Sequence, residues 1–209
     1  MKKLLKALIP IVLVLAFLWA VPASRDYMKL GAARVMALRG TPESYVRMGW
    51  ALRAIERDST ALLEAKALPW FKRAAEAGDL DGMVSLAQYY NYLTDSGSLT
   101  EWEKERELRE RYRAEGARWM LEAAQRGSAE AQYKLGYEYD EDSEAYEITP
   151  ESLPWLVKAA EQKHEWAMDA LAKYYADPDN PEQDLKQAAN WSRQFKRAQL
   201  WSKVKNRLG

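Results

Sequence analysis

The sequence predicts an all-α protein built from successive pairs of helices. Two patterns recur along the chain: a Trp followed by small residues, and a set of small, large, small and aromatic residues. No segment shows the alternation of apolar and polar residues that is typical of strands. The chain of 209 residues includes nine Trp and twelve Tyr, so burial of side chains is sufficient to form its core.

The composition excludes several classes of function. Lys and Arg total 31, and Asp and Glu also total 31, so the net charge is zero and gives no general electrostatic reason to bind nucleic acid. The absence of Cys excludes disulfides, thiolate zinc sites and a cysteine nucleophile. The chain also lacks a Gly-x-Ser-x-Gly motif, a glycine-rich phosphate loop and paired metal ligands. We therefore predict a protein that is not an enzyme and has no cofactor and no metal.

Residues 1–23 differ from the rest of the chain. Three lysines lie within the first six residues, and an uncharged stretch follows from Ala7 to Ala23. This order is typical of a secretory signal peptide cleaved after Ala23, but Arg25 disfavours cleavage, so an uncleaved anchor in the inner membrane is the alternative. Both predictions place residues 24–209 in the periplasm or at the periplasmic face of the inner membrane of a Gram-negative envelope. That part carries 28 basic and 31 acidic residues.

The first repeated pattern is a Trp followed four residues later by a pair of alanines, or by Phe in a weaker fourth copy. The four tryptophans are Trp70, Trp119, Trp155 and Trp191. Their spacings of 49, 36 and 36 residues show that the second unit has gained 13 residues. Proline is compatible with a helix only near its first turn, so Pro69 and Pro154 mark where two of the Trp helices begin.

The second pattern places small, large, small and aromatic residues at offsets 0, 4, 5 and 8, which lie on one face of a helix. The clearest copies are Gly82-Leu86-Ala87-Tyr90, Ala131-Leu135-Gly136-Tyr139 and Ala167-Leu171-Ala172-Tyr175. Small residues at these positions allow a neighbouring helix to approach closely. Ser44, Met48, Gly49 and Leu52 form a weaker copy, and Tyr27 to Arg39 is expected to be the helix before it.

Residues that start and stop helices agree with this division. Gly78 and Gly127 are expected at helix ends. Thr41-Pro42-Glu43 and Asn180-Pro181-Glu182 each place an N-cap, a first-turn Pro and an acidic residue in order, so helices are expected to start there. Ser202 to Gly209 is expected to fray. The predicted organisation is a half-repeat at 24–40 and repeats at about 41–78, 79–127, 128–163 and 164–200.

Two segments resemble the Sel1-like repeat (SLR) family, which is related to tetratricopeptide repeats. They are AEAQYKLGYEY at 129–139 and WLVKAAEQ at 155–162. The resemblance covers about residues 41–200. It implies a right-handed α-solenoid of antiparallel helix pairs that binds proteins, and it implies no catalytic residues.

In related solenoids the first helix of each pair lines the concave surface. Counted from the first small residue of the second pattern, the side chains at offsets 2 and 6 are expected to point away from the packed face. Aromatic residues at these offsets would make favourable contacts with a protein partner. The predicted partner-binding residues at these offsets are Trp50, Val84, Gln88, Tyr133, Tyr137 and Lys173. The alternative for Trp50 and Tyr133 is that they pack on neighbouring repeats.

The inserted stretch from Glu101 to Glu115 contains 11 charged residues out of 15, with opposite charges four residues apart. These pairs predict a stable helix that runs into the Trp helix of its repeat. The stretch is either a docking feature or a solvated face, and Trp102 is its apolar anchor and the seventh predicted partner-binding residue.

Two further features have a functional and a structural interpretation. Asp140, Asp142, Glu144 and Glu151 match ligand positions of a calcium-binding loop, but Ala145 stands where that loop needs Gly, so a solvated acidic loop over 140–151 is favoured. His164 has no second His or Cys at ligand spacing and is interpreted as a surface turn residue.

We therefore expect a non-enzymatic protein-binding scaffold of the bacterial cell envelope that grips a protein on its concave face. The partner is either a component of envelope machinery or a secreted type VI antibacterial toxin, in which case the chain is an immunity protein. An envelope hydrolase with two catalytic carboxylates and a glycan-binding protein are the alternatives from other classes.

Overall fold

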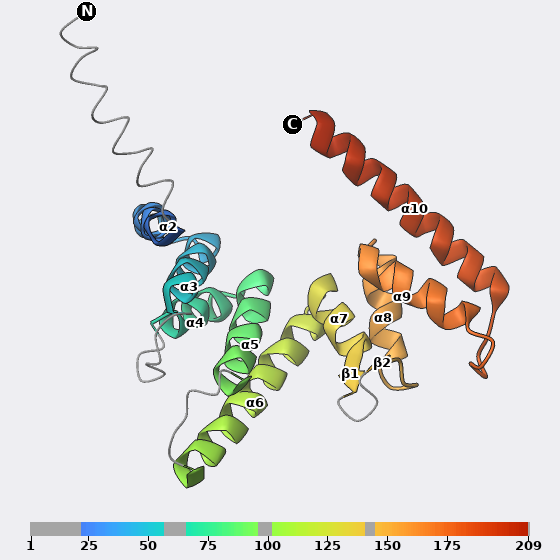
Figure 1. Ribbon diagram of the computed structural model, residues 1–209, viewed down its shortest axis with the longest axis horizontal. Helices are drawn as coiled ribbons and strands as arrows, with labels where there is room; N and C mark the ends of the chain where they lie inside the picture. Colours follow the sequence, from blue (N-terminus) through green and yellow to red (C-terminus); the bar gives the residue numbers. More distant parts are fainter. Residues whose placement is uncertain (1–21, 57–65, 96–101, 141–144, 209) are drawn as a thin grey trace, which may run out of the picture. The chain divides into compact units, whose positions relative to one another are not determined.

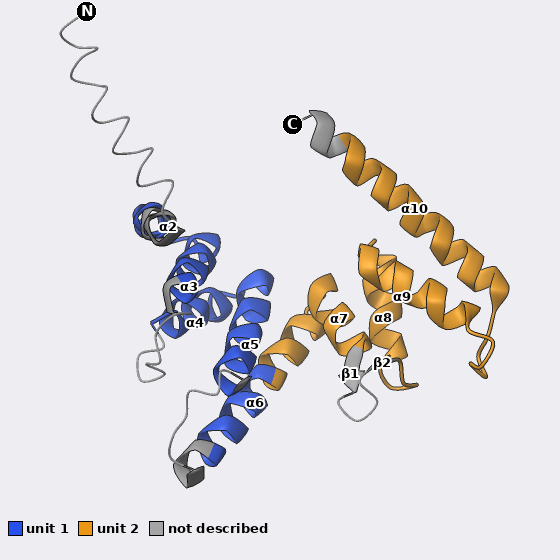
Figure 2. Ribbon diagram, viewed as in Figure 1, with its two compact units in different colours: residues 1–116 blue, residues 117–209 orange. Residues whose placement is uncertain are grey.

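The computed structural model describes residues 22–56, 66–95, 102–140 and 145–208. They form helices α2 to α10 and one pair of short strands (Figure 1). The chain divides into two compact units, Met1–Gly116 and Ala117–Gly209 (Figure 2). Most of the predicted signal peptide or anchor lies outside the described residues. Among the described helices, none is long and apolar enough to span a bilayer.

Unit 1 begins with α2 (Pro22–Ala37), which packs on α3 (Pro42–Glu56) around the buried side chains of Leu30, Ala33 and Met48. The rest of the unit consists of α4 (Leu68–Glu76), α5 (Leu80–Asp95) and the first part of α6 (Trp102–Gln125). The α3 helix starts where the sequence predicts, because the Thr41 hydroxyl accepts a hydrogen bond from the Ser44 backbone N–H at 3.3 Å.

The core of unit 1 is built around the ring of Phe71 in α4, which is fully buried. This ring lies 5.2 Å from Trp50 of α3 and 5.3 Å from Tyr89 of α5, measured between ring centroids. The α6 helix continues without a break from the charged insertion into the Trp helix, as predicted. Its Tyr112 ring contacts Tyr90 of α5 at 5.4 Å.

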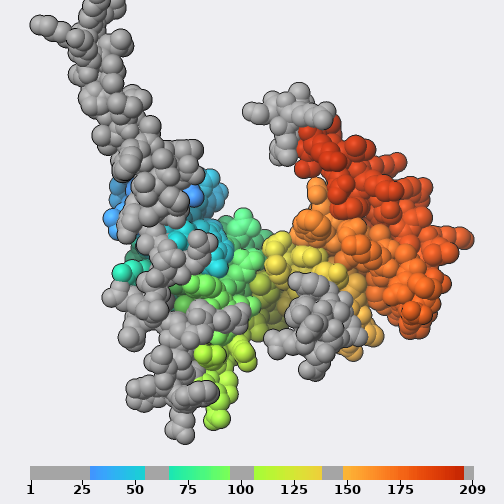
Figure 3. Space-filling model, in the orientation of Figure 1, coloured from blue at the N-terminus to red at the C-terminus, as the bar shows by residue number. Residues whose placement is uncertain are grey.

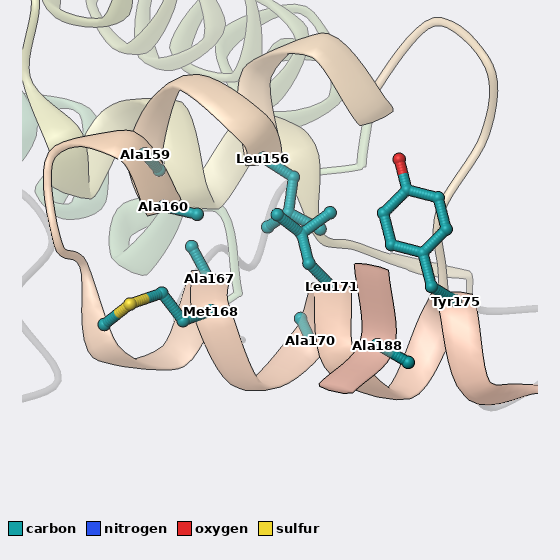
Figure 4. Close-up of a cluster of buried hydrophobic side chains, with 9 residues drawn as sticks. All are labelled: Leu156, Ala159, Ala160, Ala167, Met168, Ala170, Leu171, Tyr175 and Ala188. Carbon is teal, nitrogen blue, oxygen red and sulfur yellow. The ribbon is translucent and has the colours of Figure 1, made fainter. Parts of the chain in front are cut away.

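Unit 2 contains α7 (Ala129–Gly136), strands β1 (Glu138–Asp140) and β2 (Ala145–Glu147), α8 (Leu153–Glu161), α9 (Glu165–Ala176) and α10 (Leu185–Leu208). Its core lies between α8, α9 and α10 (Figure 4). In Figure 4, Leu156 of α8 faces Leu171 of α9, and Ala160 faces Ala167. The alanines have the role that the sequence predicts for small residues, since they let α8 and α9 approach closely.

The Trp helices α4, α6 and α8 are each followed by a residue with a positive φ angle. Gly78 has φ 84°, Gly127 has φ 98° and Lys163 has φ 66°. The left-handed region suits Gly because it has no Cβ. The sequence predicts helix ends at the two glycines, and Lys163 occupies the equivalent position in the third repeat.

The prediction of a helical Tyr139 is wrong. The α7 helix ends at Gly136, and Tyr139 lies in β1, where it pairs with Tyr146 of the antiparallel strand β2. Glycine disfavours helix continuation, and Tyr favours extended structure. The longer connection of this repeat therefore pairs with itself instead of extending the helix, and 140–151 is not a loop throughout.

The predicted start of the last helix is also wrong. The sequence places an N-cap at Asn180, but α10 begins at Leu185, and the carboxylate of Asp184 accepts the backbone N–H groups of Lys186 and Gln187. The Asn180 side chain instead accepts the N–H of Glu182 at 3.0 Å, which closes a turn. At its other end α10 continues to Leu208 rather than fraying after Ser202.

Candidate partner-binding site

A pocket of about 400 Å³ lies in unit 2 where the end of α7, the middle of α9 and the turn after α9 meet. Two of the predicted partner-binding residues, Tyr137 and Lys173, line it together. Ile148 and Ala170 add an apolar surface. The remaining lining residues belong to the end of α9 and the turn that follows: Tyr174, Asp177, Asp179 and Asn180.

Side chain to backbone hydrogen bonds hold the turn after α9 in place. The amide of Asn180 donates to the carbonyl oxygen of Tyr174 at 2.8 Å, and the backbone N–H of Asp179 donates to the Asp177 carboxylate at 2.9 Å. The Tyr174 hydroxyl donates to Glu182 at 3.2 Å. These bonds fix the wall of the pocket that carries the two aspartates, because two of them tie a side chain to the backbone and the third joins two side chains across the turn.

An aromatic stack supports the opposite wall. The Tyr137 ring stacks on Tyr133 at 5.7 Å, and Tyr133 stacks on the His164 ring at 4.6 Å. His164 is itself held, since its Nδ1 accepts the backbone N–H of Ala167 at 3.3 Å and its Nε2 lies 3.0 Å from Glu130 Oε2. Because Nδ1 accepts, Nε2 carries the proton that is donated to Glu130. The stack therefore connects the pocket wall to the start of α9.

The basic side chain at the pocket is paired with a carboxylate, whereas two of the acidic side chains are not paired with a basic one. Lys173 forms an ion pair with Asp169 at 2.7 Å, and this hydrogen-bonded carboxylate raises the pKa of Lys173. Asp177 and Asp179 are exposed, and within the described ranges neither forms an ion pair with a basic side chain. Burial, and then the bond to Glu182, raises the pKa of Tyr174, so its hydroxyl keeps its proton at neutral pH.

This arrangement suits a cationic side chain. Tyr137 and Tyr174 supply aromatic rings, which attract cations through their π faces. Asp177 and Asp179 supply carboxylate oxygens that accept charge-assisted hydrogen bonds from Arg or Lys. The pocket thus has the chemistry to receive a Lys or Arg side chain of a protein partner.

The predicted residues of unit 1 are placed differently. The indole N–H of Trp50 donates to the Ser85 hydroxyl at 3.2 Å, and its ring packs on Phe71. Val84 is 6% exposed and Gln88 is half-buried. Trp50 therefore has the packing role that was its alternative interpretation. Trp102 is the first residue of α6, and its side chain lies outside the described residues.

The interpretation of His164 as a surface turn residue is wrong, because its side chain is only 14% exposed and caps α9. Ser128 has the same role in the preceding repeat, where its hydroxyl accepts the N–H of Ala131 at 3.3 Å. Of the calcium-loop residues, Asp142 and Glu144 lie outside the described residues. In the described part of the chain, no three His, Cys, Asp or Glu side chains cluster as metal ligands would.

Six lining residues of the pocket are not among the predicted site residues: Ile148, Ala170, Tyr174, Asp177, Asp179 and Asn180. For Asp177, Asp179 and Asn180 the sequence contains a signal, an Asp-Pro-Asp-Asn-Pro run that is typical of turns, whereas nothing in the sequence distinguishes Tyr174. The second half of this run, Asn180-Pro181, predicts a helix start instead of a binding site.

Solved structures of other proteins have the same fold. A Sel1 repeat protein from Oxalobacter formigenes superposes with a TM-score of 0.57 and 22% identity, over 81% of this chain and 63% of its own. A protective antigen present in uropathogenic Escherichia coli strains, which displays an SLR fold, superposes with a TM-score of 0.55 and 23% identity, over 80% of this chain and 33% of its own. No family model and no curated protein matches the sequence. By these superpositions, this chain spans less than two thirds of the length of either solved structure. It has the SLR fold.

Proposed function

We propose that this chain is a protein-binding scaffold whose unit 2 holds a basic side chain of a protein partner in the pocket between α7, α9 and the turn after α9. The observation that carries the proposal is that two tyrosines and two exposed aspartates line the same pocket of about 400 Å³. SLR and related solenoids expose successive helices to a partner, so a protein ligand agrees with the fold.

The same geometry favours binding over acid catalysis. A carboxyl group that acts as a general acid near neutral pH needs burial to keep its proton. Asp177 and Asp179 are both exposed, so they suit a lasting interaction with a cation better than proton transfer. A glycan could also stack on the two tyrosines of the pocket, but an uncharged sugar would gain less than a cation from the two aspartates.

The proposal places the scaffold in the cell envelope, at the periplasmic side of the inner membrane. Its support is the lysine-rich, then apolar, sequence of residues 1–23. A phosphatase that is active only outside the cytoplasm, fused after residue 40, is expected to be active. An inactive fusion that is nevertheless stably produced would contradict the placement.

Capture of partners by the tagged full chain from gently solubilised envelopes tests the binding proposal. Replacing both pocket carboxylates, Asp177→Asn with Asp179→Asn, is expected to weaken capture of a specific protein about tenfold or more, because charge-assisted bonds are lost. The matched control is Glu151→Gln with Glu161→Gln, which removes two exposed charges of the same unit outside the pocket.

The control variant should capture the partner as the unchanged chain does. Equal capture by both variants would contradict a role for the pocket, and equal losses in both would assign the effect to the net charge of unit 2. The identity of the captured protein separates an immunity role, if it is a toxin, from a role in envelope assembly.

A further inference from the structure

The last helix, α10, is strongly basic. Its 24 residues include seven Lys or Arg and no Asp or Glu. The basic side chains that the structure describes are all exposed, namely Lys186, Arg193, Lys196, Arg197 and Lys203. Within the described ranges no carboxylate lies at ion-pair distance from any of them. The helix therefore presents positive charge to solvent; α10 is the segment coloured red in Figure 3, where colour follows position in the chain.

The two faces of α10 are chemically distinct. Ala188, Trp191, Phe195 and Ala198, spaced by three and four residues, pack toward the core of unit 2. The second half of the helix also carries large apolar side chains away from that core. Leu200 is 64% exposed, Trp201 is 73% exposed and Val204 is 46% exposed. The outward surface thus combines basic and large apolar residues, which is unusual for a face that only contacts water.

We propose that the outward face of α10 binds the surface of an anionic phospholipid membrane. The Lys and Arg side chains would contact lipid phosphates, while Leu200, Trp201 and Val204 enter the boundary between headgroups and acyl chains. Tryptophan prefers this boundary because its ring is apolar and its N–H is polar. This proposal concerns a surface other than the pocket, and it does not rest on the proposed partner.

Two observations favour a membrane over an acidic protein or a nucleic acid. The exposed apolar side chains Leu200, Trp201 and Val204 follow one another along the second half of α10, and a fluid bilayer accepts such a run without a fitted socket. Trp201 also borders a hollow of about 710 Å³ that Met168 and Arg197 line. Of the two alternatives predicted for residues 1–23, the uncleaved anchor would also hold this chain at a membrane. Nucleic-acid binding would use the charge but would leave Leu200 and Val204 without a role.

A single fluorescent label tests the proposal in the full chain. The chain has no Cys, so Val204→Cys gives a unique site for an environment-sensitive dye. The labelled protein is reconstituted into phosphatidylcholine vesicles with or without phosphatidylglycerol. Arg113→Cys on the exposed surface of α6 provides the control label. We expect a blue shift at position 204 only with phosphatidylglycerol, decreasing as salt is added, and no shift at position 113.

Charge removal tests the electrostatic part. Each basic residue near an anionic surface strengthens binding about fivefold, so Arg197→Gln with Lys203→Gln should weaken the membrane-bound state about 30-fold. Arg111→Gln with Arg113→Gln on α6 is the matched control and should leave the shift unchanged. Circular dichroism checks that each variant keeps its helices.

Three results would overturn the proposal. They are the absence of a shift with phosphatidylglycerol, an equal shift in neutral vesicles, and a shift that follows protein concentration without lipid. The last result would assign the outward face of α10 to contact between two copies of the chain.

Discussion

Single small residues determine how closely the paired helices of this protein pack. Ala87, Ala131 and Ala167 are fully buried at the positions where the repeated pattern predicts a small side chain. Gly136 shows why size matters there, since a Cβ atom placed on it would lie 2.7 Å from the Cα of Leu156 in α8. Backbone atoms cannot move aside as the end of a flexible side chain can.

Replacement of Gly136 by Ala is therefore expected to lower the free energy of unfolding by about 3 kcal/mol, because the added methyl group forces α7 and α8 apart. The comparison is Gly31→Ala in α2, where a Cβ meets nothing within 4 Å. That change should instead stabilise the protein by about 0.5–1 kcal/mol, since Ala favours a helix more than Gly does. Urea denaturation measures both, and equal effects would contradict the account of the close approach.

His164 provides a second prediction for a single residue. His164→Ala should lower the free energy of unfolding by about 1–2 kcal/mol, because α9 loses its N-cap. His164→Ser should recover about 1 kcal/mol of this, since Ser128 caps α7 with the same geometry. Thermal unfolding of the three proteins checks the order. If Ser behaves like Ala, the contribution of His164 comes from its contacts with Glu130 and Tyr133 and not from the cap.

At the scale of elements, several of the described helices begin through a local interaction that involves one or two residues. Pro69 and Pro154 occupy the first turns of α4 and α8, as the sequence predicts. The start of α10 depends on Asp184, whose pKa is lowered chiefly by the backbone hydrogen bond from Gln187, and then by that from Lys186. The folded state thus holds this carboxylate in its charged form.

A lowered pKa in the folded state means that the stabilisation by Asp184 is present above the pKa of the unfolded chain. It is lost as the pH falls through the lower pKa of the folded state. The difference in urea midpoint between the unchanged protein and Asp184→Ala should therefore be larger at neutral pH than in acid. Asp184→Asn, which caps without a charge, should show no such loss. A difference that stays constant down to strongly acidic pH would contradict the role of the charged cap.

The sequence alone predicts the helix pairs but not the pocket, and the reason is physical. Helix packing depends on side-chain size at fixed spacing, so Gly82 and Ala131 are recognisable without a structure. The pocket depends on the turn after α9, where Asn180 and Asp177 bind nearby backbone groups. Such bonds are determined by backbone geometry. The same residue types also begin helices, which is why the sequence predicts an N-cap at Asn180 where the structure has a turn.

At the scale of the whole molecule, the two surfaces proposed to bind partners fall outside the packing that defines the repeats. Both proposed surfaces belong to unit 2: the pocket lined by Tyr137 and Asp179, and the basic outward face of α10. In unit 1, the Trp50 ring packs on Phe71 and the Val84 side chain is buried. The central claim is therefore that unit 2 binds a protein through the pocket.

Photo-crosslinking in living cells tests this claim most directly. A photoreactive amino acid is placed at position 137 in the pocket and, as a control, at the exposed position 125 on α6. The account predicts one cross-linked protein from position 137 that is absent from position 125 and is strongly reduced when Asp177 and Asp179 are both changed to Asn. No cross-link from position 137, or one that persists at full strength in the Asn variant, would contradict the claim.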